Sequence, residues 1–163
     1  MINDSKQFRE IISLKKSIIG IDLGKKRTGI AISDINQKIA SPFKVYENKK
    51  FSDILIILKT IIDERDICAI IVGDPINMDG SIGPKSQSSR SFLKNLSKEL
   101  DVPIILWDER LSSQGAFNLS NDSASNTSKK ISKLDENSAQ FILQGALDYL
   151  TKENTWSDTI KRL

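Results

Sequence analysis

The chain has no histidine, a single cysteine and no long apolar run. Without histidine it cannot form a Ser-His-Asp or Cys-His triad, an imidazole base or most kinds of zinc site. The one cysteine, Cys68, excludes an internal disulfide, and its apolar neighbours predict a buried thiol. Any catalysis by this chain must therefore use carboxylates, lysine, arginine or metal-bound water.

The apolar segments are too short for a membrane. None reaches the roughly 18 residues that a membrane-spanning helix needs, and residues 1–16 lack the unbroken apolar core of a signal peptide. The chain has 163 residues, of which 39% are hydrophobic and 28% are charged. This composition is typical of one globular domain, which buries about 70% of its unfolded surface. We expect a cytoplasmic protein with no membrane partner.

Positive charge is concentrated in the first third of the chain. The net charge is only +3, yet residues 1–50 hold eleven Lys or Arg and five Asp or Glu. A basic face beside an acidic site suits a polyanion that is held through its phosphates. A solvated lysine-rich surface explains the charge, taken alone, equally well.

The hydrophobic pattern predicts alternating strands and helices. Strands are expected at residues 17–23, 28–33, 39–46, 67–72 and 102–107. Helices are expected from Phe51 with Ser52 as N-cap, from Pro84, and from near Asp135. Pro42 places the third strand at an edge or a bulge. We therefore predict an α/β fold, in which an antiparallel three-stranded meander and two parallel strands form a mixed five-stranded sheet flanked by helices.

The chain divides into one domain and two flanking segments. The domain is expected at residues 17–150, after an N-terminal extension at 1–16 and before a polar C-terminal tail at 151–163. Residues 121–133 are mostly Ser, Asn, Thr and Lys, a composition that predicts a mobile loop. Ser112 and Ser113 are expected to cap a short helix, because no histidine is present to activate a serine nucleophile.

Acidic side chains stand where the predicted strands end, which is where ligands collect in sheets of this kind. These residues are Asp22, Asp74, Asp108 and Glu109. Asp22 interrupts an apolar strand, where a charge costs several kcal/mol unless something pairs with it. Gly20 and Gly24 flank it and would let a ligand approach the backbone. Asp22 is thus a candidate ligand for a hard cation, and the alternative is an aspartate that caps the turn or pairs with Arg27.

The tripeptide Asp108-Glu109-Arg110 lies at the end of the last predicted strand. Strand alternation sends Asp108 and Glu109 to opposite faces, so only one of them is expected to reach the site. Glu109 has the longer reach, and Arg110 could hold a phosphate through two hydrogen bonds. The alternative is a salt bridge at the strand end.

Two further positions have both a structural and a functional interpretation. Asn77-Met78-Asp79-Gly80 is typical of a turn with Gly80 at positive φ, while its functional alternative is a loop whose amides and Asn77 touch substrate. Asp135 stands at the start of a predicted helix, where capping and the helix dipole alone favour an acid.

Four segments together resemble the YqgF/RuvX family of the RNase H-like (retroviral integrase) superfamily. They are Gly20-Ile-Asp22-Leu-Gly24-Lys-Lys-Arg27-Thr-Gly29, Val72-Gly73-Asp74-Pro75-Ile76-Asn77, Asp108-Glu109-Arg110-Leu111-Ser112-Ser113, and Lys133-Leu134-Asp135 leading into Ala139-Gln140. The resemblance implies an RNase H-like fold and a catalytic triad of Asp22, Glu109 and Asp135, with Asp108 as a possible substitute for Glu109. The same three residues are then expected to hold one or two Mg²⁺ or Mn²⁺ ions.

The resemblance also implies an activity and a substrate. The expected activity is hydrolysis of phosphodiester bonds by a nuclease that matures the 5′ end of precursor 16S ribosomal RNA in ribosome biogenesis. The alternatives are a Holliday junction resolvase acting on branched DNA, and a non-catalytic assembly or transcription factor that binds nucleic acid. Flanking phosphates are expected at Lys25, Lys26, Arg27 and Arg110, with Asn77 as a further contact. Both a monomer and a homodimer are compatible with this reading.

Asp74 departs from the family pattern. The position after Val72-Gly73 is usually apolar in the family, whereas RuvC-type resolvases carry a carboxylate near the end of the equivalent strand. Asp74 could therefore be an additional metal ligand or a charge that tunes the site, and it could equally face solvent.

Overall fold

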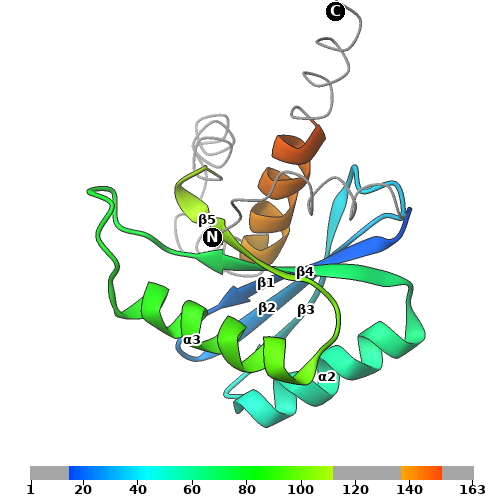
Figure 1. Ribbon diagram of the computed structural model, residues 1–163, viewed down its shortest axis with the longest axis horizontal. Coiled ribbons are helices and arrows are strands. Elements are labelled where there is room, and N and C mark those ends of the chain that lie inside the picture. The colour runs from blue at the N-terminus through cyan, green and yellow to red at the C-terminus, as the bar shows by residue number, and fades with distance from the viewer. Residues whose placement is uncertain (1–14, 112–136, 152–163) are drawn as a thin grey trace, which may run out of the picture.

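The computed structural model describes residues 15–111 and 137–151, and its centre is a five-stranded sheet (Figure 1). The strands are β1 (Ser17–Leu23), β2 (Arg27–Ser33), β3 (Ala40–Glu47), β4 (Ile67–Asp74) and β5 (Ile104–Asp108). Their order across the sheet is β3-β2-β1-β4-β5. Strands β1, β2 and β3 pair antiparallel, while β4 runs parallel to both β1 and β5. The predicted mixed sheet is thereby confirmed.

Helices cover both faces of this sheet (Figure 1). Helices α2 (Phe51–Glu64) and α3 (Pro84–Glu99) lie on one face, and a helix formed by residues 137–151 lies on the other. A 3-10 turn, Glu109–Leu111, directly follows β5. No helix in the described part of the chain is both long and apolar enough to span a membrane.

The sheet separates two apolar cores, because side chains alternate along each strand. On the α2/α3 face, Ile70 and Val72 of β4 pack with Leu58 and Leu96. On the opposite face, Leu143 and Leu147 of the helix at residues 137–151 pack with Ile18 of β1, Ile71 of β4 and Trp107 of β5. Every residue of β4 is buried, as its unbroken apolar sequence predicts for a strand covered on both faces. The predicted buried thiol is confirmed, since Cys68 is 6% exposed.

The sequence predicted the strand and helix boundaries to within a few residues, with one incorrect cap. β3 is an edge strand, and its register with β2 shifts between Ile30 and Ala31, opposite Pro42, as the proline predicts. The N-cap of α2 is Lys50 and not Ser52. The Asp53 carboxylate in the first turn reaches back and accepts the backbone N–H of Lys50 at 3.0 Å, the bond that an acid at this position makes to the cap residue.

Close contact between sheet and helix explains one of the glycines. A Cβ added at Gly20 would lie 2.6 Å from Cβ of Leu143 and 3.1 Å from the carbonyl oxygen of Ala139. Gly20 therefore admits a helix of the protein itself, and the expectation that it admits a ligand was wrong. The same contact brings the beginning of that helix to the end of β1, where Asp22 stands.

Candidate active site

Asp22 lies near the carboxyl end of β1, opposite Gly29 of β2. Its side chain is partly exposed, and by alternation it shares a face with Gly20. A Cβ added at Gly29 would be 3.8 Å from Cβ of Asp22 and 3.3 Å from Cβ of Ala139. The Asp22 carboxylate is thus located at the rim of the sheet, beside the first described turn of the helix at residues 137–151.

Glu109 begins the 3-10 turn after β5 and reaches back across β4. Its carboxylate packs against Gly73, where an added Cβ would overlap the Glu109 oxygen and would lie only 2.7 Å from Cδ1 of Ile142. The missing side chain at Gly73 therefore makes the space that the Glu109 carboxylate occupies. Ile142 belongs to the helix at residues 137–151, so Glu109 lies on the same face of the sheet as Asp22.

The electrostatic surroundings of Glu109 are strongly negative. The pKa of Glu109 is raised to about 7, first by burial and then by the charges of Asp22, Asp74 and Asp108, while Lys85 opposes the increase. Among the charged neighbours, Asp22 has the largest effect. Two carboxylates that repel each other in a half-buried position form a set of oxygen donors that a divalent cation would neutralise.

The third residue of the predicted triad, Asp135, lies outside the described residues, as do Ser112, Ser113 and the 121–133 segment. Asp135 precedes the described helix by two positions in the sequence. In the described ranges, no three His, Cys, Asp or Glu side chains are placed to hold a metal ion together. The structure therefore brings Asp22 and Glu109 to one face and leaves the position of Asp135 a prediction.

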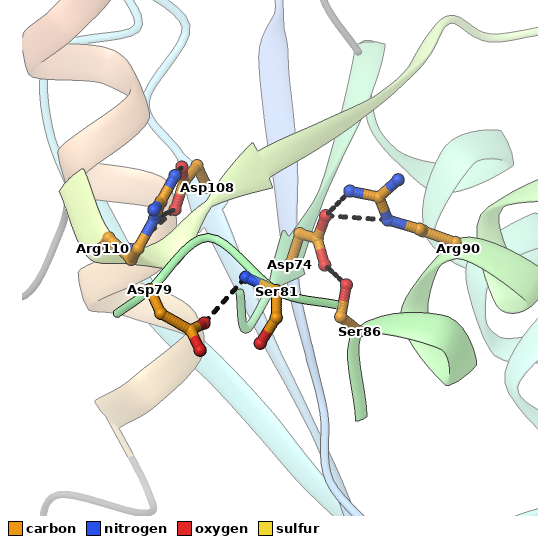
Figure 2. A network of polar contacts seen from close by, with 7 residues as sticks. All are labelled: Asp74, Asp79, Ser81, Ser86, Arg90, Asp108 and Arg110. Carbon is orange, nitrogen blue, oxygen red and sulfur yellow. Dashed lines mark hydrogen bonds and ion pairs between the residues drawn. The ribbon is translucent and has the colours of Figure 1, made fainter. Parts of the chain in front are cut away.

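Asp108 has a different environment from Glu109. Its carboxylate accepts hydrogen bonds from the Arg110 guanidinium, at 2.6 Å from Nη2 and 3.0 Å from Nε (Figure 2). These bonds lower the pKa of Asp108. Because Asp108 is opposite Asp74 in the register of β4 and β5, the two aspartates share the α3 face, away from Asp22. Arg110, predicted to hold a phosphate, is bound to its neighbour in the same tripeptide.

Asp74 does not face solvent. Its side chain is 2% exposed, and the Arg90 guanidinium donates to one carboxylate oxygen from Nη2 at 2.8 Å and from Nε at 3.1 Å. The hydroxyl of Ser86 donates to the other oxygen (Figure 2). Both carboxylate oxygens of Asp74 thus accept hydrogen bonds from side chains of α3. Sequence reasoning missed Ser86 and Arg90, and the available signal was a serine and an arginine four positions apart on one predicted helix after a buried aspartate.

The β4–α3 loop, residues 75–83, is held by its own hydrogen bonds. The Asn77 side-chain amide donates to Oγ of Ser81 at 2.8 Å, and the Gly80 N–H donates to the Asn77 carbonyl at 2.8 Å. Asp79 accepts the Ser81 N–H at 2.8 Å (Figure 2). Gly80 has a φ of 84°, so the predicted turn is confirmed. At its tip, Met78 is 89% exposed.

The basic turn between β1 and β2 follows Asp22 directly. Lys25, Lys26 and Arg27 are all exposed. Nε of Arg27 is 3.3 Å from a carboxylate oxygen of Glu47 on β3, a half-exposed pair of the kind that contributes little to stability. The turn therefore presents cations at the same edge of the sheet as the Asp22 carboxylate.

The RuvX family, described as Holliday junction resolvase, matches residues 16–149 of the chain. The chain belongs to the RuvX family. A RuvX relative from Pelagibacter ubique is 50% identical over 136 residues, which cover 83% of this chain and 90% of the relative. A second, from Rhodobacter capsulatus, is 42% identical over 135 residues, which cover 82% and 84%. Both relatives carry the name "Putative pre-16S rRNA nuclease".

The RuvX chain also resembles a solved structure of T. thermophilus RuvC in complex with a Holliday junction substrate. The TM-score is 0.52 at 14% sequence identity, and the match covers 81% of this chain and 93% of the other. At this identity the likeness concerns the fold, and it confirms the predicted RNase H-like architecture of this RuvX member.

Proposed function

We propose that the protein is a metal-dependent nuclease that hydrolyses phosphodiester bonds at the 5′ end of precursor 16S ribosomal RNA. The observation that carries the proposal is the Glu109 carboxylate, packed against Gly73 beside the negative charge of Asp22. The names of relatives up to 50% identical support the choice of substrate. A protein that processes precursor ribosomal RNA would act in the cytoplasm, and we therefore propose a cytoplasmic location.

A divalent cation fits the donor set of this site. Asp22 and Glu109 offer only oxygen, which suits Mg²⁺ or Mn²⁺, and Asp135 is the proposed third ligand. When bound, the metal would lower the pKa of an attacking water and stabilise the charge that develops on the phosphate. The chain itself contributes positioning, because Gly73 and Ile142 confine the Glu109 carboxylate while β1 fixes Asp22.

Substrate phosphates are proposed to lie along the basic β1–β2 turn. Lys25, Lys26 and Arg27 are exposed next to Asp22, and each cation that contacts a phosphate releases a counterion and strengthens binding at low salt. Arg110 and Asn77 are further proposed contacts on the β5 and β4–α3 sides of the site. These five side chains would bind the RNA substrate, while Asp22 and Glu109 would act at the scissile bond.

The test is cleavage of a labelled precursor 16S 5′-leader RNA with Mg²⁺ or Mn²⁺. Wild type is expected to cut the RNA, and D22N and E109Q are expected to lower kcat by at least about 100-fold, because each removes a charged ligand. The surface variant D63N on α2 is the matched control and should cut like wild type. Undiminished cleavage by D22N would show that the carboxylate assignment is wrong.

A DNA substrate is the second candidate, favoured by the family description as Holliday junction resolvase. A synthetic four-way DNA junction, incubated under the same conditions, separates the two functions. Symmetric paired cuts in the junction, made by a two-fold homodimer, would assign the protein to recombination. Cleavage of the RNA alone assigns it to ribosome biogenesis, and cleavage of neither leaves a non-catalytic nucleic-acid-binding factor.

A further inference from the structure

We propose that Lys85 binds a phosphate next to the scissile one, and that the Asp74–Ser86–Arg90 cluster holds Lys85 in that place. The inference rests on the proposed nuclease function and adds a substrate contact from α3, an element that none of the predicted site residues occupies. It is carried by the anchoring of α3 to β4, by the position of Lys85 in the first turn, and by the pairing of the other cations nearby.

The first turns of α3 are anchored to the carboxyl end of β4. Ser86 and Arg90, four positions apart on one face of the helix, both donate to the buried Asp74 carboxylate (Figure 2). A bidentate, charge-assisted pair of this kind restricts the relative orientation of the two elements. Asp74 is adjacent in the chain to Gly73, against which the Glu109 carboxylate packs. The beginning of α3 is therefore fixed at the same edge of the sheet as the candidate active site.

Lys85 is the cation that this anchoring places at the rim. It follows Pro84 at the N-terminus of α3 and precedes Ser86, whose side chain is fully buried. Neighbouring residues on a helix point about 100° apart, so Lys85 is exposed while Ser86 faces Asp74. Ser86 donates to Asp74, the residue after Gly73, so Lys85 lies at the edge of the sheet where the Glu109 carboxylate packs against Gly73.

The other cations at this end of α3 and β5 are already paired. Arg90 binds Asp74 and Arg110 binds Asp108, whereas within the described ranges Lys85 forms no ion pair. An exposed ammonium that forms no ion pair among the described residues, at the same edge of the sheet as carboxylates suited to a divalent cation, is complementary to a phosphate group of the substrate. Lys85 would hold that phosphate from the α3 side, across the site from the basic β1–β2 turn.

The first experiment measures binding of the labelled 5′-leader RNA without divalent metal, over a range of salt concentrations. K85Q is expected to weaken binding about tenfold and to reduce the slope of log K against log salt by about 0.7 to 0.9, the loss of one phosphate contact. K85R should retain both. K94Q, which removes an exposed lysine from the same helix, is the matched control and should behave like wild type.

Cleavage kinetics provide a second measurement. Because a contact to a neighbouring phosphate is made before and during the reaction, K85Q is expected to raise KM about tenfold with little change in kcat. If K85Q matches K94Q in affinity, salt slope and KM, the inference is overturned while the nuclease function stands. If wild type binds but cuts neither RNA nor junction, the nuclease function fails while the Lys85 effect on binding still decides the inference.

A double-mutant cycle tests the positioning role of the cluster. S86A leaves the Arg90–Asp74 pair in place and should raise KM severalfold when Lys85 is present. In the K85Q background, S86A should have no further effect on KM, because the two residues then act through one contact. Additive effects of S86A and K85Q would overturn the positioning role, and thermal melting of both single variants checks that they are folded.

Discussion

Single residues at this site are governed by burial and like charge. Glu109 packs against Gly73 at the rim of the sheet, and it is the residue on which the charges of Asp22, Asp74 and Asp108 act together. Each of these charges favours a proton on Glu109 when no cation is bound. The ionised form of Glu109, which metal binding requires, is thus unfavourable in the metal-free protein. The titration of Glu109 should therefore change the stability of the fold.

The pH dependence of protein stability should show the unfavourable ionisation of Glu109. The pKa of Glu109 is raised from 4.5 to about 7 in the folded state. The proton that the folded state retains therefore contributes stability that is complete below about pH 4.5 and is lost as the pH rises through 7. In metal-free buffer, E109Q should melt increasingly above wild type between pH 5 and pH 8. Addition of Mg²⁺ at pH 8 should raise the melting temperature of wild type more than that of E109Q. If the melting temperatures of E109Q and wild type differ by the same amount at every pH, the environment assigned to Glu109 is wrong.

How far the site could be predicted differs from one residue to the next. The placement of Asp22 and Glu109 at the same edge of the sheet, at the ends of β1 and β5, follows from strand alternation and parallel order, which the sequence pattern shows. The partners of Asp74 could not be predicted, because they depend on how α3 is rotated against β4. Ser52 was assigned wrongly as a cap, because serine is a favoured cap residue and the sequence does not show that the backbone becomes helical directly after Lys50.

Among the elements, the helix at residues 137–151 packs closely on the sheet at two glycines, Gly20 and Gly73. Six of its apolar residues recur at helical spacing in the sequence, and all six of them are buried: Ala139, Ile142, Leu143, Ala146, Leu147 and Leu150. The close packing of this helix on the strands was not predicted from the sequence, because Gly20 was interpreted as a residue that lets a ligand approach. What the glycine admits is Leu143.

Substitution of Gly20 by alanine should separate the helix from the sheet. The added methyl group would lie 2.6 Å from Cβ of Leu143, and overpacking of this kind typically costs about 1–3 kcal/mol of folding free energy. Cleavage should also fall, because Ile142 of this helix confines Glu109. Denaturant unfolding and the RNA cleavage assay measure the two effects. Equal unfolding midpoints for G20A and wild type would contradict the packing.

At the scale of the whole molecule, the sheet carries two separate apolar cores, one on each face. The α2/α3 core contains Leu58, and the core under the helix at residues 137–151 contains Leu143; both side chains are fully buried. β4 contributes to both cores through alternate residues, Val72 on one side and Ile71 on the other. The two layers should therefore unfold together.

Large-to-small substitutions in either core test this coupling. L58A and L143A should each lower the free energy of unfolding by about 2–5 kcal/mol, and the double variant should show nearly the sum, because the sites lie on opposite faces. Circular dichroism and tryptophan fluorescence should give one coincident transition for every variant. Two separate transitions for L143A would mean that the α2/α3 layer stays folded alone.

The order of synthesis has a consequence for when activity can arise. Ribosomes make the strands that carry Asp22 and Glu109 before they make residues 137–151, whose helix covers the same face of the sheet and confines Glu109. A nascent chain that stops before residue 137 therefore lacks the wall that holds its carboxylate in place. We therefore expect the nascent chain to lack nuclease activity while it is still attached to the ribosome, until residues 137–151 have been made and have packed on the sheet.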